Sequence, residues 1–117
     1  MKPIGQIGEE MAAEFLKKQK YKIVERNFRI RGGEIDIIAL DGKTLVYIEV
    51  KTRTSHQFGL PAESVTPSKL NFLIRAAKFY RNNRGYLSLP EAERIDLVAV
   101  DFTSGEPNLQ LIKNITF

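Results

Sequence analysis

The stretch that decides the fold is GEIDIIALDGKTLVYIEVKTR, residues 33–53. It contains two runs rich in Ile and Val, Glu34 to Leu40 and Thr44 to Arg53, separated by Asp41-Gly42-Lys43. β-Branched residues favour strands, and an Asp-Gly pair between two such runs is typical of a tight hairpin turn. We therefore expect two antiparallel strands joined by this turn.

Both runs place charged residues in the middle of an otherwise apolar strand. Because successive side chains point to opposite faces, Glu34 and Asp36 should share one face of the first run. The other face of that run would carry Ile35, Ile37 and Ala39. In the second run the charged face carries Tyr47, Glu49 and Lys51, and the face behind it carries Val46, Ile48 and Val50.

The position of the turn decides how the acidic residues face one another. With Gly42-Lys43 as the loop, Asp36 lies directly opposite Glu49; with Asp41-Gly42 as the loop, Asp36 lies opposite Tyr47 and diagonal to Glu49. Either loop brings both carboxylates to one face, where each raises the pKa of the other unless a cation neutralises them. Oxygen ligands with open positions suit Mg²⁺, which stabilises charge developing on a cleaved phosphodiester.

Two further residues complete a candidate site. Lys51 lies two positions beyond Glu49 and points to the same face, where its ammonium could hold a phosphate or help to activate an attacking water. Glu9 is at helical spacing from Ala12 and Leu16, which places a third acid at the edge of an apolar helical stripe.

The first helix is predicted between Ile4 and Lys18. Its apolar residues recur at helical spacing and are Ile4, Ile7, Met11, Phe15 and Leu16. Gly5 and Gly8 weaken the first turns, so either the helix starts late or its backbone approaches another element closely.

The remaining pattern predicts one more helix and three more strands. A strand runs from Tyr21 to Ile30 before Gly32-Gly33, and a helix starts at Thr66-Pro67, an N-cap followed by proline, and ends near residues 82–85. Two strands, at residues 95–102 and 109–115, close the chain around a turn at residues 103–107. The predicted class is α/β with a central mixed five-stranded sheet, in the order αβββαββ.

Length and composition narrow the classes of function. A chain of 117 residues is expected to form one domain, residues 1–117. The absence of cysteine and the single histidine, His56, exclude disulfides, thiolate metal sites and a structural zinc site. No stretch approaches the ~20 apolar residues that span a bilayer, so we expect a soluble, cytoplasmic protein with no membrane partner.

The net charge of +4 and the isoelectric point of about 9.4 are compatible with a polyanionic partner. Candidate nucleic-acid contacts near the acidic residues are Arg26, Arg29, Arg53 and Gln57, although ion pairs with Glu25 or Glu34 explain the arginines equally well. A second basic cluster, Arg75, Lys78, Arg81 and Arg84, fits a solvated surface as well as a phosphate track.

Three other sets of residues have a structural interpretation beside a functional one. Glu34 fits a structural partner of Arg31 or Lys51 as well as a fourth acid of the site. The loop residues His56 and Gln57 fit an ordinary loop role better than catalysis. The aromatic residues Phe72, Phe79 and Tyr80 lie on or near the apolar stripe of the second helix, which predicts core packing instead of base stacking.

The acidic strands carry a family resemblance. Glu49-Val50-Lys51 resembles the PD-(D/E)xK nuclease motif, with Ile35 in place of the proline, a backbone position that carries no ligand. With Gly5-Gln6-Ile7-Gly8-Glu9, the pattern is similar to archaeal Holliday-junction resolvases. Over nearly the whole chain it resembles the YraN family of bacterial proteins, through the segments Arg26-Asn27, Gly33-Glu34-Ile35-Asp36, Glu49-Val50-Lys51-Thr52-Arg53, Phe58-Gly59 and Lys69.

The resemblance implies a restriction-endonuclease-like three-layer domain. Asp36, Glu49 and Glu9 would ligate Mg²⁺ or Mn²⁺, and Lys51 would act on the water and the phosphate. The implied activity is hydrolysis of nucleic-acid phosphodiesters, with DNA favoured over RNA, selectivity for branched structures and a homodimer as the assembly. The alternatives are a non-catalytic nucleic-acid-binding protein that retains the fold, and a protein-interaction adaptor.

Overall fold

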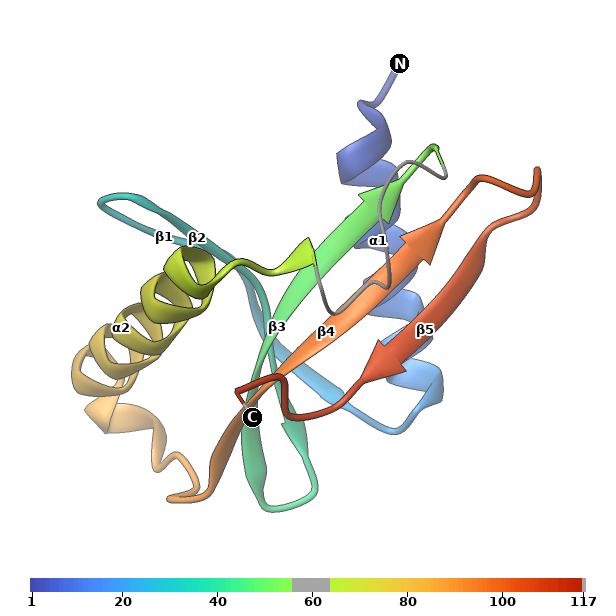
Figure 1. The fold of residues 1–117 in the computed structure, drawn as a ribbon. Helices are drawn as coiled ribbons and strands as arrows, with labels where there is room; N and C mark the ends of the chain where they lie inside the picture. The colour runs from blue at the N-terminus through green and yellow to red at the C-terminus, as the bar shows by residue number, and fades with distance from the viewer. Residues whose placement is uncertain (56–63, 117) are drawn as a thin grey trace.

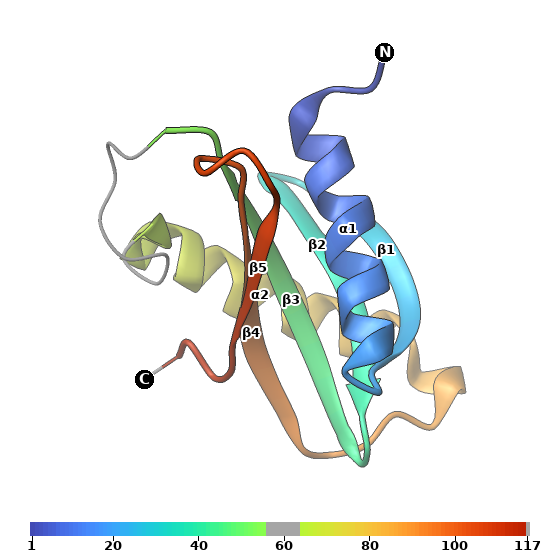
Figure 2. The same ribbon diagram turned by 90° about the vertical axis from the view of Figure 1, so that its right-hand side faces the viewer.

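Five strands form one mixed sheet between two helices in the computed structural model, which describes residues 1–55 and 64–116. The elements in chain order are α1 (Ile4–Lys18), β1 (Lys22–Ile30), β2 (Gly33–Asp41), β3 (Thr44–Arg53), α2 (Pro67–Asn83), the 3₁₀ helix η2 (Gly85–Leu87), β4 (Glu93–Asp101) and β5 (Asn108–Ile112). The strands lie side by side in sequence order, and only β3 and β4 are parallel neighbours. Figures 1 and 2 show α1 on one face of the sheet and α2 on the other. This confirms the predicted α/β class, the order αβββαββ and the three-layer, restriction-endonuclease-like arrangement.

The β2–β3 hairpin turns at Gly42-Lys43, because Asp41 pairs with Thr44. This is the first of the two loops considered above, and Gly42 has the positive φ of 58° that such turns require. The main-chain pairing of β2 with β3 continues only to Ile37 and Ile48. Beyond that pair the strands diverge: the β1–β2 hairpin bends over α2, whereas β3 continues beside β4 (Figure 1). We call this divergence the fork.

The expectation that Ile35 and Ile37 share a face is wrong. Ile35 packs in the core cluster on the α2 side, and Ile37 packs in the cluster on the α1 side. The change of face occurs in β2 between Ile35 and Ile37. On the neighbouring strand β1, Asn27 lies between the pairs Arg26–Ile37 and Phe28–Ile35 and has a φ of 53°. A left-handed residue interrupts the pleat, and asparagine is one of the few residue types that tolerate this conformation. The regular alternation of side chains is therefore lost where the fork opens.

The α2 helix starts as predicted, with Thr66 as N-cap accepting a hydrogen bond from Lys69 N at 3.1 Å. Phe72 and Tyr80 are buried in the core, as expected from the helical spacing. Phe79 is 49% exposed, so the prediction of core packing is wrong for this residue. The prediction followed the apolar stripe, but Phe79 lies at its exposed margin.

The α1 helix packs on the sheet through its smallest residues. The buried residues are Gly8, Ala12, Ala13 and Leu16, whereas Ile4, counted in the apolar stripe, is 46% exposed. A Cβ atom built on Gly8 would lie 2.1 Å from Thr52 Oγ1 of β3, but one on Gly5 would meet nothing within 4 Å. Of the two alternatives, the second is correct: the helix starts at Ile4, and Gly8 allows the close approach of its backbone to the sheet.

The C-terminal strand is shorter than predicted, ending at Ile112 instead of Ile115. Asn114 has a φ of 56°, and Ile115 N donates to Ile95 O at 2.8 Å, which turns the chain back against β4. No helix in the described part of the chain is long and apolar enough to cross a membrane.

The two α1 glycines provide a matched test of this packing. We expect Gly8→Ala to lower the free energy of unfolding by about 1–3 kcal/mol, because the methyl group would overlap Thr52. Gly5→Ala should leave stability unchanged or raise it by up to about 1 kcal/mol, since alanine favours the helix and the position is open. Urea unfolding followed by circular dichroism measures both. Equal effects of the two substitutions would contradict the close contact.

Candidate functional site

Asp36 lies at the vertex of the fork and is 8% exposed. Its Oδ2 accepts a hydrogen bond from the main-chain N–H of Val50 at 2.8 Å. This bond lies just beyond the last main-chain pair of β2 and β3. The Asp36 side chain therefore links the two strands where their main chains are no longer paired. Asp36 is thereby fixed between the two arms of the fork.

The surroundings of Asp36 raise its pKa to about 8. The largest cause is burial, followed by the negative charge of Glu49; a hydrogen bond with Glu49 and the charge of Glu9 act in the same direction. The hydrogen bond from Val50 opposes them by stabilising the ionised form. Without a compensating cation, Asp36 therefore holds its proton at neutral pH.

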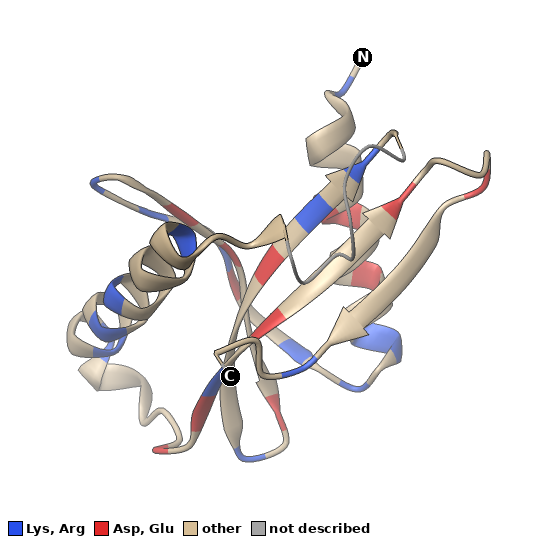
Figure 3. Ribbon diagram, viewed as in Figure 1, with Lys and Arg blue, Asp and Glu red and all other residues tan. Residues whose placement is uncertain are grey.

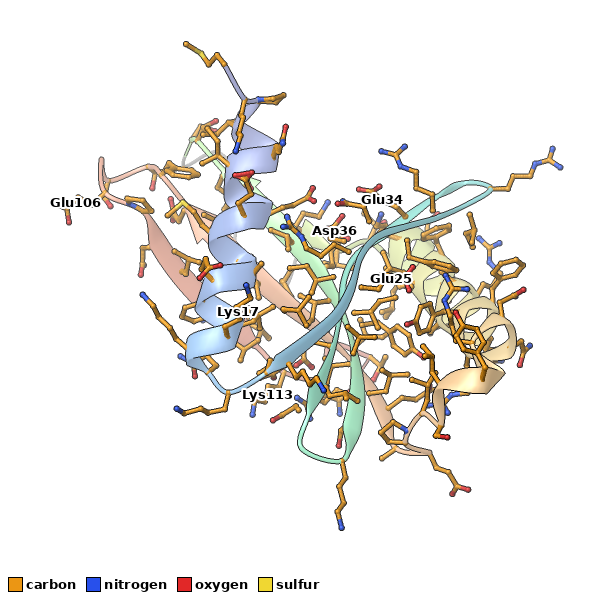
Figure 4. The ribbon with its side chains drawn as sticks, turned by 180° about the vertical axis from the view of Figure 1, so that it is seen from behind. Lys17, Glu25, Glu34, Asp36, Glu106 and Lys113 are labelled. Atoms are coloured by element: carbon orange, nitrogen blue, oxygen red, sulfur yellow. The ribbon has the colours of Figure 1, made fainter. Side chains whose placement is uncertain are left out.

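Glu9, Glu34 and Asp36 form an acidic triplet in which one oxygen of each carboxylate lies within 4.8 Å of the others. Glu9 comes from α1, while the other two come from β2, where Figure 4 shows them side by side. Asn27 Nδ2 donates to Glu9 Oε1 at 2.9 Å and also lies 3.4 Å from Glu34 Oε1. The left-handed residue that disturbs the pleat thus also links the helix to the hairpin. Three converging carboxylates could hold a metal ion.

Glu34 has an oxygen that lacks a hydrogen-bond donor. Its Oε2 is shielded from solvent and has no hydrogen-bond partner among the described residues. Arg29 Nε lies 3.2 Å from this atom, but its N–H is not aligned for a hydrogen bond. The ion-pair partner of Glu34 is therefore Arg29, not Arg31 or Lys51. Since buried polar atoms are rarely left without a partner, this oxygen suits a cation.

Glu49 lies on the other side of Asp36 and is 3% exposed. Its Oε2 is 3.7 Å from Lys51 Nζ and 3.6 Å from Lys69 Nζ. Glu49 is not part of the acidic triplet, but it is close enough to Asp36 to raise the pKa of that residue. The site therefore has an acidic side towards α1 and a side towards α2 where two ammonium groups meet one carboxylate.

Lys69 is the residue of this site to which the sequence assigned no role. It is separated from Glu49 by a long segment and reaches it only through the packing of α2. Two signals were available: Lys69 is among the residues that carry the family resemblance, and a lysine in the first helical turn is unfavourable for the helix dipole and so points to another partner.

Glu9 and Glu34 of the acidic triplet line an open cleft of about 580 Å³ between α1 and the β1–β2 hairpin, whereas Asp36 is not part of its lining. The residues that line it include Glu9, Glu34, Arg26 and Arg29. Two of the arginines suggested as phosphate contacts thus border the acidic residues. Arg53 lies at the end of β3, opposite Asp101 in the register of β3 and β4, and is not part of this lining. Gln57, together with His56, lies outside the described residues.

Asp96 shows how this fold treats a buried acid that has a structural role. It is fully buried in β4 and accepts hydrogen bonds from Tyr21 OH at 2.8 Å, Arg94 Nε at 2.8 Å and Asn114 N at 2.9 Å. Donors therefore surround the Asp96 carboxylate, whereas the acidic residues at the fork converge on one another. That difference makes the fork the candidate site.

Comparisons with known proteins give a family for this chain. The sequence pattern of a group described as Uncharacterised protein family UPF0102 matches residues 8–100. A UPF0102 protein of Dehalococcoides mccartyi is 47% identical over 113 residues, which cover 97% of this chain and 92% of that protein. A UPF0102 protein of Geobacter sulfurreducens is 43% identical over 115 residues, covering 98% and 87%.

A third relative extends the similarity to another organism. A UPF0102 protein of Symbiobacterium thermophilum is 45% identical over 112 residues, which cover 95% of this chain and 93% of that protein. Because the family pattern and these relatives span most of its length, the chain belongs to the uncharacterised protein family UPF0102, the YraN family that its motifs resemble.

Proposed function

We propose that this chain is a divalent-metal-dependent nuclease that hydrolyses phosphodiester bonds of nucleic acids, with DNA favoured over RNA. The observation that carries the proposal is the convergence of Glu9, Glu34 and Asp36 next to the Glu49–Lys51 pair. Convergent carboxylates offer a place for a divalent cation, and the adjacent ammonium groups offer one for a phosphate.

The chemistry of the acidic residues suits Mg²⁺ or Mn²⁺. The donors are carboxylate oxygens, one of them, Glu34 Oε2, lacks a hydrogen bond, and the acidic residues repel one another when ionised. The proposed ligands are Asp36, Glu49 and Glu9, to which the geometry adds Glu34. When bound, the metal would stabilise negative charge on the phosphate and favour ionisation of a water molecule.

Lys51 and Lys69 are suited to hold the scissile phosphate. Hydrolysis joins a water oxygen to phosphorus and breaks a P–O ester bond, while negative charge grows on the phosphoryl oxygens. The side chain of Lys51 is 37% exposed and that of Lys69 31% exposed, so both can turn from Glu49 towards a substrate. Arg26 and Arg29 at the cleft would hold neighbouring phosphates. Cleavage of branched DNA would need two such sites, so a cytoplasmic homodimer is part of the proposal.

The activity test uses neutral isosteres of the acidic residues. Purified protein with Mg²⁺ or Mn²⁺ should cleave at least one substrate among linear, flapped and four-way-junction DNA and RNA. Asp36→Asn and Glu49→Gln should each lower the rate at least about a hundredfold, because each removes a proposed ligand. Glu14→Gln is the control, since this α1 glutamate is 69% exposed and pairs only with Lys17 among the described residues.

The same assay separates cleavage from binding alone. If the wild-type protein binds DNA but cleaves no substrate with any divalent metal, the chain is a binding protein that retains the fold. If Asp36→Asn cleaves as fast as the wild-type protein, the assignment of the site is wrong.

The raised pKa of Asp36 predicts a pH-dependent stability in the absence of divalent metal. Its pKa is about 8 in the folded chain against an ordinary value of 3.8, so between these values the folded chain keeps a proton that the unfolded chain loses. The stability linked to this proton is present below about pH 4 and is lost as the pH rises through about 8. The slope is at most about 1.4 kcal/mol per pH unit. Asp36→Asn should remove it, as urea unfolding over this range would show.

The stabilisation gained from metal binding should depend on pH in the opposite direction. The cation displaces the proton of Asp36, so stabilisation by Mn²⁺ should increase with pH up to about 8 and weaken in Asp36→Asn. Thermal unfolding with and without Mn²⁺ measures the effect. A stabilisation that is equal at all pH values and unchanged in the variant would exclude Asp36 as a ligand.

A further inference from the structure

The α2 helix presents a basic surface beside the fork. Between Pro67 and Asn83 it contains Lys69, Arg75, Lys78 and Arg81 and no acidic residue, as the blue segments of Figure 3 show. Its exposed positions fall on one side at helical spacing, and we call the following residues the α2 stripe: Asn71, Arg75, Lys78, Phe79 and Asn82. At a rise of about 1.5 Å per residue the stripe is about 16 Å long.

The charges of the stripe are not neutralised by neighbouring acidic residues. Arg81 and Arg84 of the second basic cluster form ion pairs, at 3.0 Å each, with Glu93 and Glu25. In the described part of the chain, Arg75 and Lys78 form no ion pair with an acidic residue. The cluster therefore divides into two structural arginines and two cations available to a polyanion.

Phe79 stands among these cations. It is one helical turn from Arg75 and next to Lys78, and it is 49% exposed. Its ring centroid lies 6.3 Å from that of Phe28, which supports it against β1. An exposed aromatic ring between cations is the arrangement that binds single-stranded nucleic acid, where bases stack on the ring and phosphates contact the cations. Bases inside a duplex are stacked on one another and cannot reach such a ring.

The stripe is connected to the fork through Phe72. The Cζ of Arg75 lies 5.7 Å and the Nζ of Lys69 5.2 Å from the centroid of this ring. The same Nζ is 3.6 Å from Glu49 Oε2. A chain of positive charge thus leads from the exposed face of α2 to the carboxylates of the site.

We propose that the α2 stripe binds a single-stranded segment of the substrate and leads it to the fork. Phe79 stacks on a base, while Arg75 and Lys78 contact phosphates on either side of it. This inference rests on the proposed function and specifies its substrate class: nucleic acid with an unpaired segment next to the bond that is cleaved.

A tryptophan at position 79 reports the contact directly. The chain contains no tryptophan, so Phe79→Trp introduces a single indole. Its fluorescence should be quenched when oligothymidylate is added without divalent metal, and less by a duplex of equal length. Phe15→Trp on α1, which covers the opposite face of the sheet, is the control and should show no quenching (Figure 2). An oligouridylate in parallel distinguishes RNA from DNA as the source of the strand.

Two further measurements test the energetic roles. Phe79→Ala should weaken binding of oligothymidylate by about 5- to 150-fold, the range found for loss of one stacked base. Arg75→Ala and Lys78→Ala should each reduce the slope of log affinity against log salt by about 0.7. Lys18→Ala on α1 is the matched control and should leave the slope unchanged.

The outcomes separate this inference from the nuclease proposal. Quenching at position 79 with loss of affinity in Phe79→Ala supports the stripe. Equal quenching by duplex and single strand, or an unchanged affinity of Phe79→Ala, overturns it even if metal-dependent cleavage is observed. Binding at the stripe without cleavage by any metal would support the stripe as a single-strand binding surface, but it would reject the nuclease proposal and with it the delivery of a substrate to the fork.

Discussion

The hydrogen bond from Val50 N–H to Asp36 is the interaction on which the site depends. A sheet can open only where the backbone groups that lose their partners find others, because an unpaired buried N–H is unfavourable. Asp36 supplies the acceptor at 2.8 Å, just beyond the last pair of β2 and β3. The same carboxylate is buried by the arms of the fork, which raises its pKa. The position of Asp36 at the vertex of the fork therefore explains both its bond to Val50 and its burial, and the effect of burial on the pKa outweighs that of the bond.

The parts of the fold that follow regular periodicity could be predicted from the sequence. The alternation in β3 places Val46 and Ile48 on the α1 side and Tyr47 on the α2 side. The observed register of the β2–β3 hairpin is one of the two that the Asp-Gly turn predicted. In β2 the prediction was wrong for Ile35: the alternation breaks opposite Asn27, whose left-handed conformation leaves no trace in the hydrophobic pattern. The position of Lys69 at the site depends on how α2 packs, which no local pattern specifies.

The role of a charged residue in this protein depends on its hydrogen-bond and ion-pair partners. The net charge of +4 does not distinguish Arg81 and Arg84, which hold Glu93 and Glu25, from basic residues without such partners. The same holds for buried acidic residues: Asp96 accepts hydrogen bonds from several donors, while Asp36 accepts one from Val50 and otherwise lies beside other carboxylates. A sequence shows the residue type in both cases. Only the packing of several elements shows which charges are already compensated.

The site joins α1, β2 and β3, so its geometry is set by the way these elements pack. Gly8 lets the α1 backbone approach Thr52, and the next residue, Glu9, reaches the acidic triplet from that position. A glycine inside a helix is unfavourable by about 1 kcal/mol relative to alanine, and converging carboxylates are a second unfavourable feature. A cation that binds only the folded chain would offset the second and leave the first. The contact with Thr52 accounts for Gly8, whereas the converging carboxylates have no such structural reason and support the proposal of a cation at the fork.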